Sequence, residues 1–109
     1  MINENRLKEV VQELNVFEAE RLRADGYTNS CFFNPDGSLT KDYSIKYLIK
    51  KKWAYINFGT SGAFMVKKDD GNIFNIDGYG VPNLAKFRGN IDTIDINELH
   101  KNRYYYLRG

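Results

Sequence analysis

The stretch that decides the fold is residues 53–76, WAYINFGTSGAFMVKKDDGNIFNI. β-Branched and aromatic residues dominate three parts of it, residues 53–58, 63–68 and 72–76, and such residues favour strands. The segments between them contain glycine and are short enough to be hairpin turns. The sequence therefore predicts three consecutive antiparallel strands, which is a β-meander.

An amphipathic helix is predicted before this sheet. Between residues 5 and 23, apolar side chains recur at spacings of three, four and seven, and charged side chains occupy the other side. Asn3 is the expected N-cap, and Asp25-Gly26 is the expected end of the helix. Asn15 and Glu18 have the spacing of a capping box that would divide the segment, but we favour one helix, with or without a kink.

The connection from the helix to the meander is harder to assign. Residues 31–33, Cys-Phe-Phe, are expected to form a short strand, and residues 34–37, Asn-Pro-Asp-Gly, predict a chain reversal. Residues 39–52 fit two patterns. Tyr43, Ile45, Tyr47 and Ile49 alternate as in a strand, whereas Ile45, Leu48, Ile49 and Trp53 fit a helix face; we favour the strand.

After the meander, residues 77–83 (DGYGVPN) are expected to end the sheet as a shaped loop. Asp95 followed by Glu98 predicts one or two helical turns, and residues 104–107 either continue that helix or add a strand. The resulting expectation is a single α+β domain, residues 1–109. An N-terminal amphipathic helix packs on an antiparallel β-meander of about four to five strands, followed by a short C-terminal helix or strand. The opposite face of the sheet stays open.

Composition excludes several classes of protein. The hydrophobic fraction of 42% and charged fraction of 28% are typical of a folded domain, and no apolar stretch is long enough to span a membrane. The start of the chain is polar and lacks the profile of a signal peptide, so a soluble, cytoplasmic protein is expected. The single cysteine, Cys31, and the single histidine, His100, exclude an internal disulfide and a zinc finger.

Motifs for catalysis are weak. Residues 59–62, Gly-Thr-Ser-Gly, lack the Gly-Lys-Ser/Thr and the helix of a phosphate-binding loop, and Ser61 lacks the context of a nucleophile elbow. Cys31 and His100 could form a thiol–imidazole pair, although a buried cysteine and a surface histidine are the default. No carboxylate pair has a recognisable catalytic spacing. We therefore expect no enzyme activity, no cofactor and no metal site.

Charge is segregated along the chain. Residues 41–68 hold seven lysines and one aspartate, although the whole chain has a net charge of only +2. Two segments combine cations with aromatic rings as single-stranded nucleic-acid binders do, namely residues 46–55 (KYLIKKKWAY) and 103–108 (RYYYLR). The alternative reading is that the aromatic residues belong to the core and that the lysines protect an edge strand, and we favour it.

Residues 59–83 carry a resemblance to a protein family. The runs GTSGAFMV and DGNIFNIDGYGVPN resemble a pattern of short proteins encoded by bacterial phages and mobile elements. The resemblance implies a small single domain that inhibits a host system, as anti-CRISPR and other anti-defence proteins do. It assigns no catalytic residue.

The leading hypothesis is a non-enzymatic protein that binds and inhibits a host protein acting on nucleic acid. The alternatives are a direct nucleic-acid-binding module and a nucleotide-binding sponge built on residues 59–62 and 78–82. An open sheet edge and a helix-free face would also allow a symmetric homodimer. The partner-binding residues are expected among the exposed members of one set: Tyr47, Lys50, Lys51, Lys52, Trp53, Tyr79, Asn83, Arg103 and Tyr105.

Overall fold

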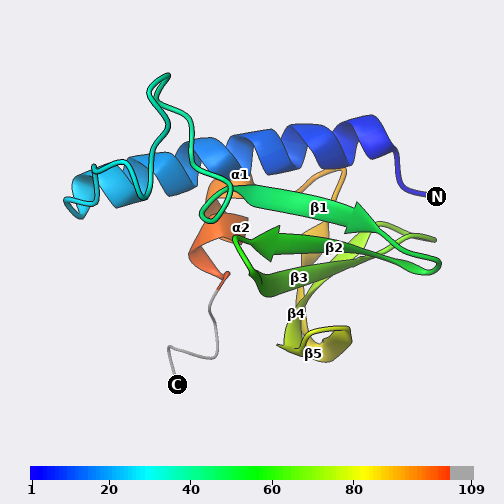
Figure 1. Ribbon diagram of the computed structural model, residues 1–109. Helices are drawn as coiled ribbons and strands as arrows, with labels where there is room; N and C mark the ends of the chain where they lie inside the picture. The colour runs from blue at the N-terminus through cyan, green and yellow to red at the C-terminus, as the bar shows by residue number, and fades with distance from the viewer. Residues whose placement is uncertain (104–109) are drawn as a thin grey trace.

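The computed structural model of the protein describes residues 1–103 (Figure 1). Its elements are α1 (Glu4–Ala24), β1 (Ile45–Ile49), β2 (Trp53–Phe58), β3 (Ser61–Lys67), β4 (Asn72–Gly78), β5 (Val81–Asn90) and α2 (Ile96–Lys101). The strands form one five-stranded antiparallel sheet in the order β1-β2-β3-β4-β5. The predicted α+β meander is therefore confirmed, and the C-terminal element that the structure describes is a short helix.

The helix α1 is continuous, as predicted. The side chain of Asn3 accepts a hydrogen bond from the backbone N–H of Asn5 at its start. At its end, Gly26 has a φ of 86°, which a residue with a Cβ atom adopts only at a cost. The apolar stripe faces the sheet, and the buried residues of α1 are Leu7, Val10, Val11, Leu14, Glu18, Ala19 and Leu22.

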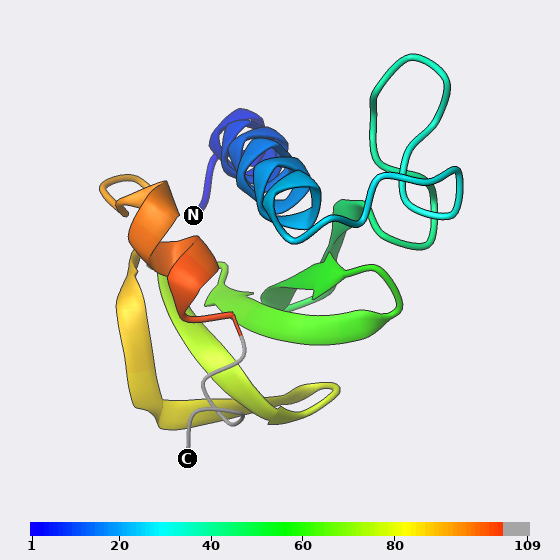
Figure 2. The same cartoon turned by 90° about the vertical axis from the view of Figure 1, so that its left-hand side faces the viewer.

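Both helices lie on the same side of a strongly curved sheet (Figure 2). Alternate residues of the strands point toward them and form the core. From the sheet this core includes Ile45, Ala54, Ile56, Phe58, Phe64, Val66 and Ile73, and from the second helix it includes Ile96 and Leu99. Removal of this apolar surface from water is the main stabilising contribution, about 25 cal/mol per Å². Within residues 1–103, no helix lies on the other face of the sheet, as predicted.

Residues 77–83 differ from the prediction. The strand β4 continues to Gly78 and β5 begins at Val81, so the expected loop is only the turn Tyr79-Gly80, with Gly80 at a φ of 83°. Pro82 does not end the sheet because β5 is an edge strand, where a missing N–H need not remove a ladder hydrogen bond. Pairing between β4 and β5 shifts register at three places, and β5 bends sharply along its length (Figure 2).

Residues 25–44 form a loop that projects beside the C-terminal end of α1 (Figure 1). The predicted strand at residues 31–33 is wrong, because only Phe33 makes an isolated bridge, to Leu39. The predicted turn is confirmed: Gly37 has a φ of 90° and donates its N–H to the carbonyl of Asn34. Of residues 39–52, the favoured strand is confirmed for β1 alone, since residues 41–43 form a turn.

Candidate binding surface

One line of apolar side chains crosses the helix-free face of the sheet. Its members are partners in the strand register, in the order Leu48, Tyr55, Met65, Phe74 and Phe87. Directly opposite residues of neighbouring strands point to the same face, so these side chains are contiguous. On the three central strands, residues that alternate with them belong to the helix-covered core, namely Ala54, Ile56, Phe64, Val66 and Ile73. We call this line the apolar row.

The apolar row is buried at its centre and open at its ends. Met65 is 2% exposed, whereas Leu48 at one edge is 43% exposed and Phe87 at the other is 54% exposed. The ring of Phe74 lies 5.7 Å from that of Phe87 and 6.0 Å from that of Trp53, measured between centroids. The rings therefore pack against one another, and the ends of the apolar row remain exposed.

Tyr79 extends this surface at the β4–β5 turn. Its side chain is 59% exposed, its ring makes an edge contact with Tyr55 at 5.3 Å, and its hydroxyl accepts a hydrogen bond from Asn57 Nδ2 at 3.3 Å. Gly62 allows this position, since a Cβ atom there would lie 3.0 Å from the Tyr79 ring and 2.7 Å from Ile76. The Tyr79 ring thus packs on one side against Tyr55 and close to Gly62, and more than half of the side chain remains exposed.

A hollow of about 410 Å³ lies between the β2–β3 and β4–β5 turns. These are the turns that the nucleotide-binding hypothesis names, and the structure brings them together. The hollow is lined by Thr60, Ser61, Gly62, Ile76, Asp77, Gly78 and Tyr79. This lining contributes the carboxylate of Asp77 and no lysine or arginine, which disfavours an anionic ligand.

Lysines gather at one corner of the sheet. Lys50, Lys51 and Lys52 are exposed around the β1–β2 turn. The ammonium of Lys68 donates to the carbonyl of Lys50 at 3.0 Å and to that of Lys51 at 3.4 Å, and the exposed Lys67 is the register partner of Trp53. We call the five residues Lys50, Lys51, Lys52, Lys67 and Lys68 the lysine corner. Four of the predicted partner-binding residues, Lys50 to Trp53, therefore lie together.

The other predicted residues lie elsewhere. Tyr47 is half-buried on the helix-covered side, where it packs against the core. Asn83 is half-buried on β5 and donates to Asp77 Oδ1 at 2.9 Å. The side chain of Arg103 is 13% exposed and faces the interior, so it does not join the lysine corner. Tyr105 lies outside the described residues.

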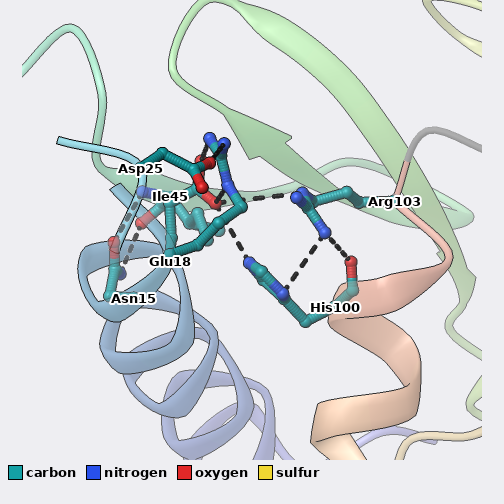
Figure 3. A network of polar contacts seen from close by, with 7 residues as sticks. Asn15, Glu18, Asp25, Ile45, His100 and Arg103 are labelled. Carbon is teal, nitrogen blue, oxygen red and sulfur yellow. Dashed lines mark hydrogen bonds and ion pairs between the residues drawn. The ribbon is translucent and has the colours of Figure 1, made fainter. Parts of the chain in front are cut away.

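A buried cluster of charges joins the two helices (Figure 3). Glu18 of α1 is 5% exposed and its Oε1 lies 3.0 Å from His100 Nε2 of α2. Arg21 donates to both carboxylate oxygens, at 3.0 and 3.2 Å, and Arg103 Nε lies 3.8 Å from Oε1. Burial raises the pKa of Glu18, but the hydrogen bonds from His100 and Arg21 and the charges of Arg21 and Arg103 lower it to about 2. The carboxylate is therefore a poor proton acceptor.

Both ring nitrogens of His100 are engaged within this cluster. Arg103 Nη1 lies 3.3 Å from Nδ1, and because a guanidinium only donates, we assign Nδ1 as the acceptor and Nε2–H as the donor to Glu18. Cys31 is exposed on the projecting loop. The hypothetical Cys31–His100 pair is therefore contradicted. The default expectation of a buried cysteine and a surface histidine is also wrong, because Cys31 is exposed and His100 is buried. Sequence reasoning missed the cluster, although Glu18 interrupts the apolar stripe of α1.

Residues 1–103 contain no group of three or more His, Cys, Asp or Glu side chains placed to hold a metal ion. In the same part of the chain, neither helix combines the length and the apolar character needed to cross a membrane. Comparison with protein-family models, curated proteins and solved structures found no match to this chain.

Proposed function

We propose that this protein is a non-enzymatic binding protein whose partner lies against the helix-free face of its sheet. The observation that carries the proposal is the apolar row with Tyr79 beside it. Sheet faces left open in a monomer are usually polar, whereas Leu48, Phe87 and Tyr79 expose 43–59% of their surface here. Aromatic side chains at such a surface contribute much of the binding energy in protein complexes.

The partner that we propose is a protein. Phe74 contacts Phe87 within the row and Trp53 beside it, with tilted or edge-on rings, so these rings offer an apolar area and no slot between parallel rings for a base. The resemblance of residues 59–83 to phage and mobile-element proteins extends the proposal to inhibition, in the cytoplasm, of a host protein that acts on nucleic acid. Acidic side chains such as Asp69, Asp70 and Asp92 are exposed and could occupy positions that phosphates take on such a partner.

The experiment is affinity capture from a bacterial host lysate treated with nuclease, followed by binding measurements with variants. Phe87→Ser and Leu48→Ser alter opposite ends of the apolar row without touching the helix-covered core. Val16→Ser is the matched control, because Val16 is 55% exposed on α1. We expect one protein to be retained by the wild type and by Val16→Ser and lost from both row variants. Retention by the row variants at wild-type affinity would contradict the proposal.

The second candidate is direct binding of single-stranded nucleic acid, favoured by the lysine corner beside Trp53. Exposed cations next to an aromatic ring bind phosphates and stack a base. If this candidate is correct, the protein binds an oligonucleotide with an affinity that falls steeply with salt concentration. This salt dependence should be shallower in a Lys50→Gln, Lys51→Gln, Lys52→Gln variant. The nucleotide-binding sponge has less support, because the hollow between the two turns is lined by Asp77.

A further inference from the structure

The outer edge of β1 is paired with a side chain in place of a strand. Asn15 of α1 accepts the N–H of Ile45 at 2.7 Å and donates to the C=O of Ile45 at 3.0 Å (Figure 3). A carboxamide carries the same donor and acceptor as a peptide group. Asn15 thus occupies the place of one residue of a sixth strand and shows how a further chain would pair.

The next groups along this edge are open. Lys50 donates its N–H to Trp53 and Ser44 accepts from Gly59, so the even-numbered residues of β1 bond to β2. Tyr47 and Ile49 therefore direct their N–H and C=O outward, as Ile45 does. Within residues 1–103, the outward groups of Ile45 are hydrogen-bonded to Asn15, whereas those of Tyr47 and Ile49 make no hydrogen bond. Short, open edge strands are templates for strand addition.

A groove runs along this edge beside α1. One part, of about 390 Å³, is lined by Lys8, Val11, Gln12, Ile45, Lys46 and Tyr47. It adjoins a second part, of about 500 Å³, between α1 and residues 37–44, and Gln12 lines both. Ile49 is 37% exposed near the end of the strand. The space is sufficient for a few residues of an extended chain, which needs about 3.3 Å of length per residue.

The charges around the edge of β1 indicate which kind of chain would bind there. Lys8 and Lys46 line the first part of the groove, Glu20 and Arg23 carry opposite charges in the second part, and Lys50 follows the strand. A second copy of this chain paired along β1 would bring its own Lys46 and Lys50 close to these lysines, and facing like charges destabilise strand pairing. We propose that the edge of β1 binds an extended acidic segment of a partner protein by strand addition, with main-chain pairing at Tyr47 and Ile49 and carboxylates near Lys8 and Lys46.

This site shares β1 with the apolar row, which ends at Leu48, but it uses the main chain of Tyr47 and Ile49 and does not depend on the side chains of the row. The probe is a short synthetic peptide in which valine alternates with glutamate; the comparison peptide has lysine in place of glutamate. Ile49→Pro removes an outward N–H and leaves the bonds between β1 and β2, whereas Ile49→Ala keeps the N–H and is the matched control. We expect Ile49→Pro to weaken binding of the acidic peptide about tenfold or more, and Ile49→Ala to retain most of it.

Amide hydrogen exchange, measured on the wild type, tests the proposal even if the Ile49→Pro variant does not fold. The amides of Tyr47 and Ile49 should exchange quickly in the free protein and slowly with the acidic peptide bound, while Phe87→Ser behaves like the wild type. Equal binding of the lysine peptide, unchanged exchange at Tyr47 and Ile49, or slow exchange there in a self-associated free protein would each overturn the proposal. The last outcome would identify a second copy as the occupant.

Discussion

Glu18 shows what a single buried charge demands of its surroundings. It takes a position in the apolar stripe of α1, and its carboxylate is stabilised by Arg21 on the same helix and by His100 and Arg103 at the other end of the described chain. Removing one partner of a buried ion pair usually costs more than the pair contributes, because the other charge stays buried. The cluster therefore holds α1 against α2 through polar contacts that tolerate little change.

We predict that the contribution of Glu18 to stability disappears in acid. Its pKa is lowered from 4.5 to about 2 in the folded protein, so the contribution is complete above pH 4.5 and is lost as the pH falls from 4.5 toward 2. Glu18→Gln should lower the free energy of unfolding near neutral pH by on the order of 3 kcal/mol, and the difference from wild type should shrink below pH 4.5. Denaturant unfolding of the wild type and the variant at several pH values measures this difference in the free energy of unfolding.

Glu20→Gln is the matched control, since Glu20 is exposed on the same helix. Its difference from wild type should be small and should not follow the same pH range. A Glu18→Gln difference that stays constant down to pH 2 would show that the carboxylate stabilises the fold without its charge.

Single residues with local roles were predictable, and those with distant partners were not. Asn3 and Asp95 cap their helices as the spacing indicates, because a cap is decided within four residues of chain. The pairing of Glu18 with His100 spans 82 positions and depends on how two helices cross the sheet. The available signal was a charged residue at a position where the helix pattern requires an apolar one.

At the scale of elements, the wrong predictions concern segments whose residue types favour one structure while their position in the fold allows another. Residues 77–83 contain two glycines and a proline, which normally interrupt a strand, yet an edge strand with register shifts accommodates Pro82. Conversely, Cys31, Phe32 and Phe33 favour a strand by composition but have no neighbouring strand to pair with. The strands β2, β3 and β4 were predicted because short glycine-containing turns separate three runs of β-branched and aromatic residues.

We predict that Asn15→Ala loosens the first strand more than it affects the rest of the sheet. The substitution removes both hydrogen bonds to Ile45 and leaves its partly buried N–H and C=O without that partner, which costs about 1–3 kcal/mol. The amide of Ile45 should exchange faster, as measured by hydrogen exchange, while amides of β3 keep their relative protection. Gln12→Ala, one turn earlier and exposed, is the control and should leave Ile45 protected.

At the scale of the whole molecule, one core connects α1, α2 and the sheet, so we predict a single unfolding transition. Leu99 of α2 is 1% exposed within this core, and Leu99→Ala should lower the free energy of unfolding by about 2–5 kcal/mol. Far-ultraviolet circular dichroism reports the helices, and the fluorescence of Trp53 reports the helix-free face. Midpoints that coincide in wild type and variant support one cooperative unit; separated midpoints would indicate that α2 unfolds by itself.

The span between Glu18 and His100 also bears on how the polypeptide is assembled during synthesis. The meander consists of neighbouring hairpins, whose contacts close early and locally as the chain emerges from the ribosome. The first helix, although translated first, carries a carboxylate whose counterpart on the second helix is made 82 residues later. The Glu18 carboxylate is therefore fully paired only after α2 has been made, so this part of the core is completed late in the synthesis of the described chain.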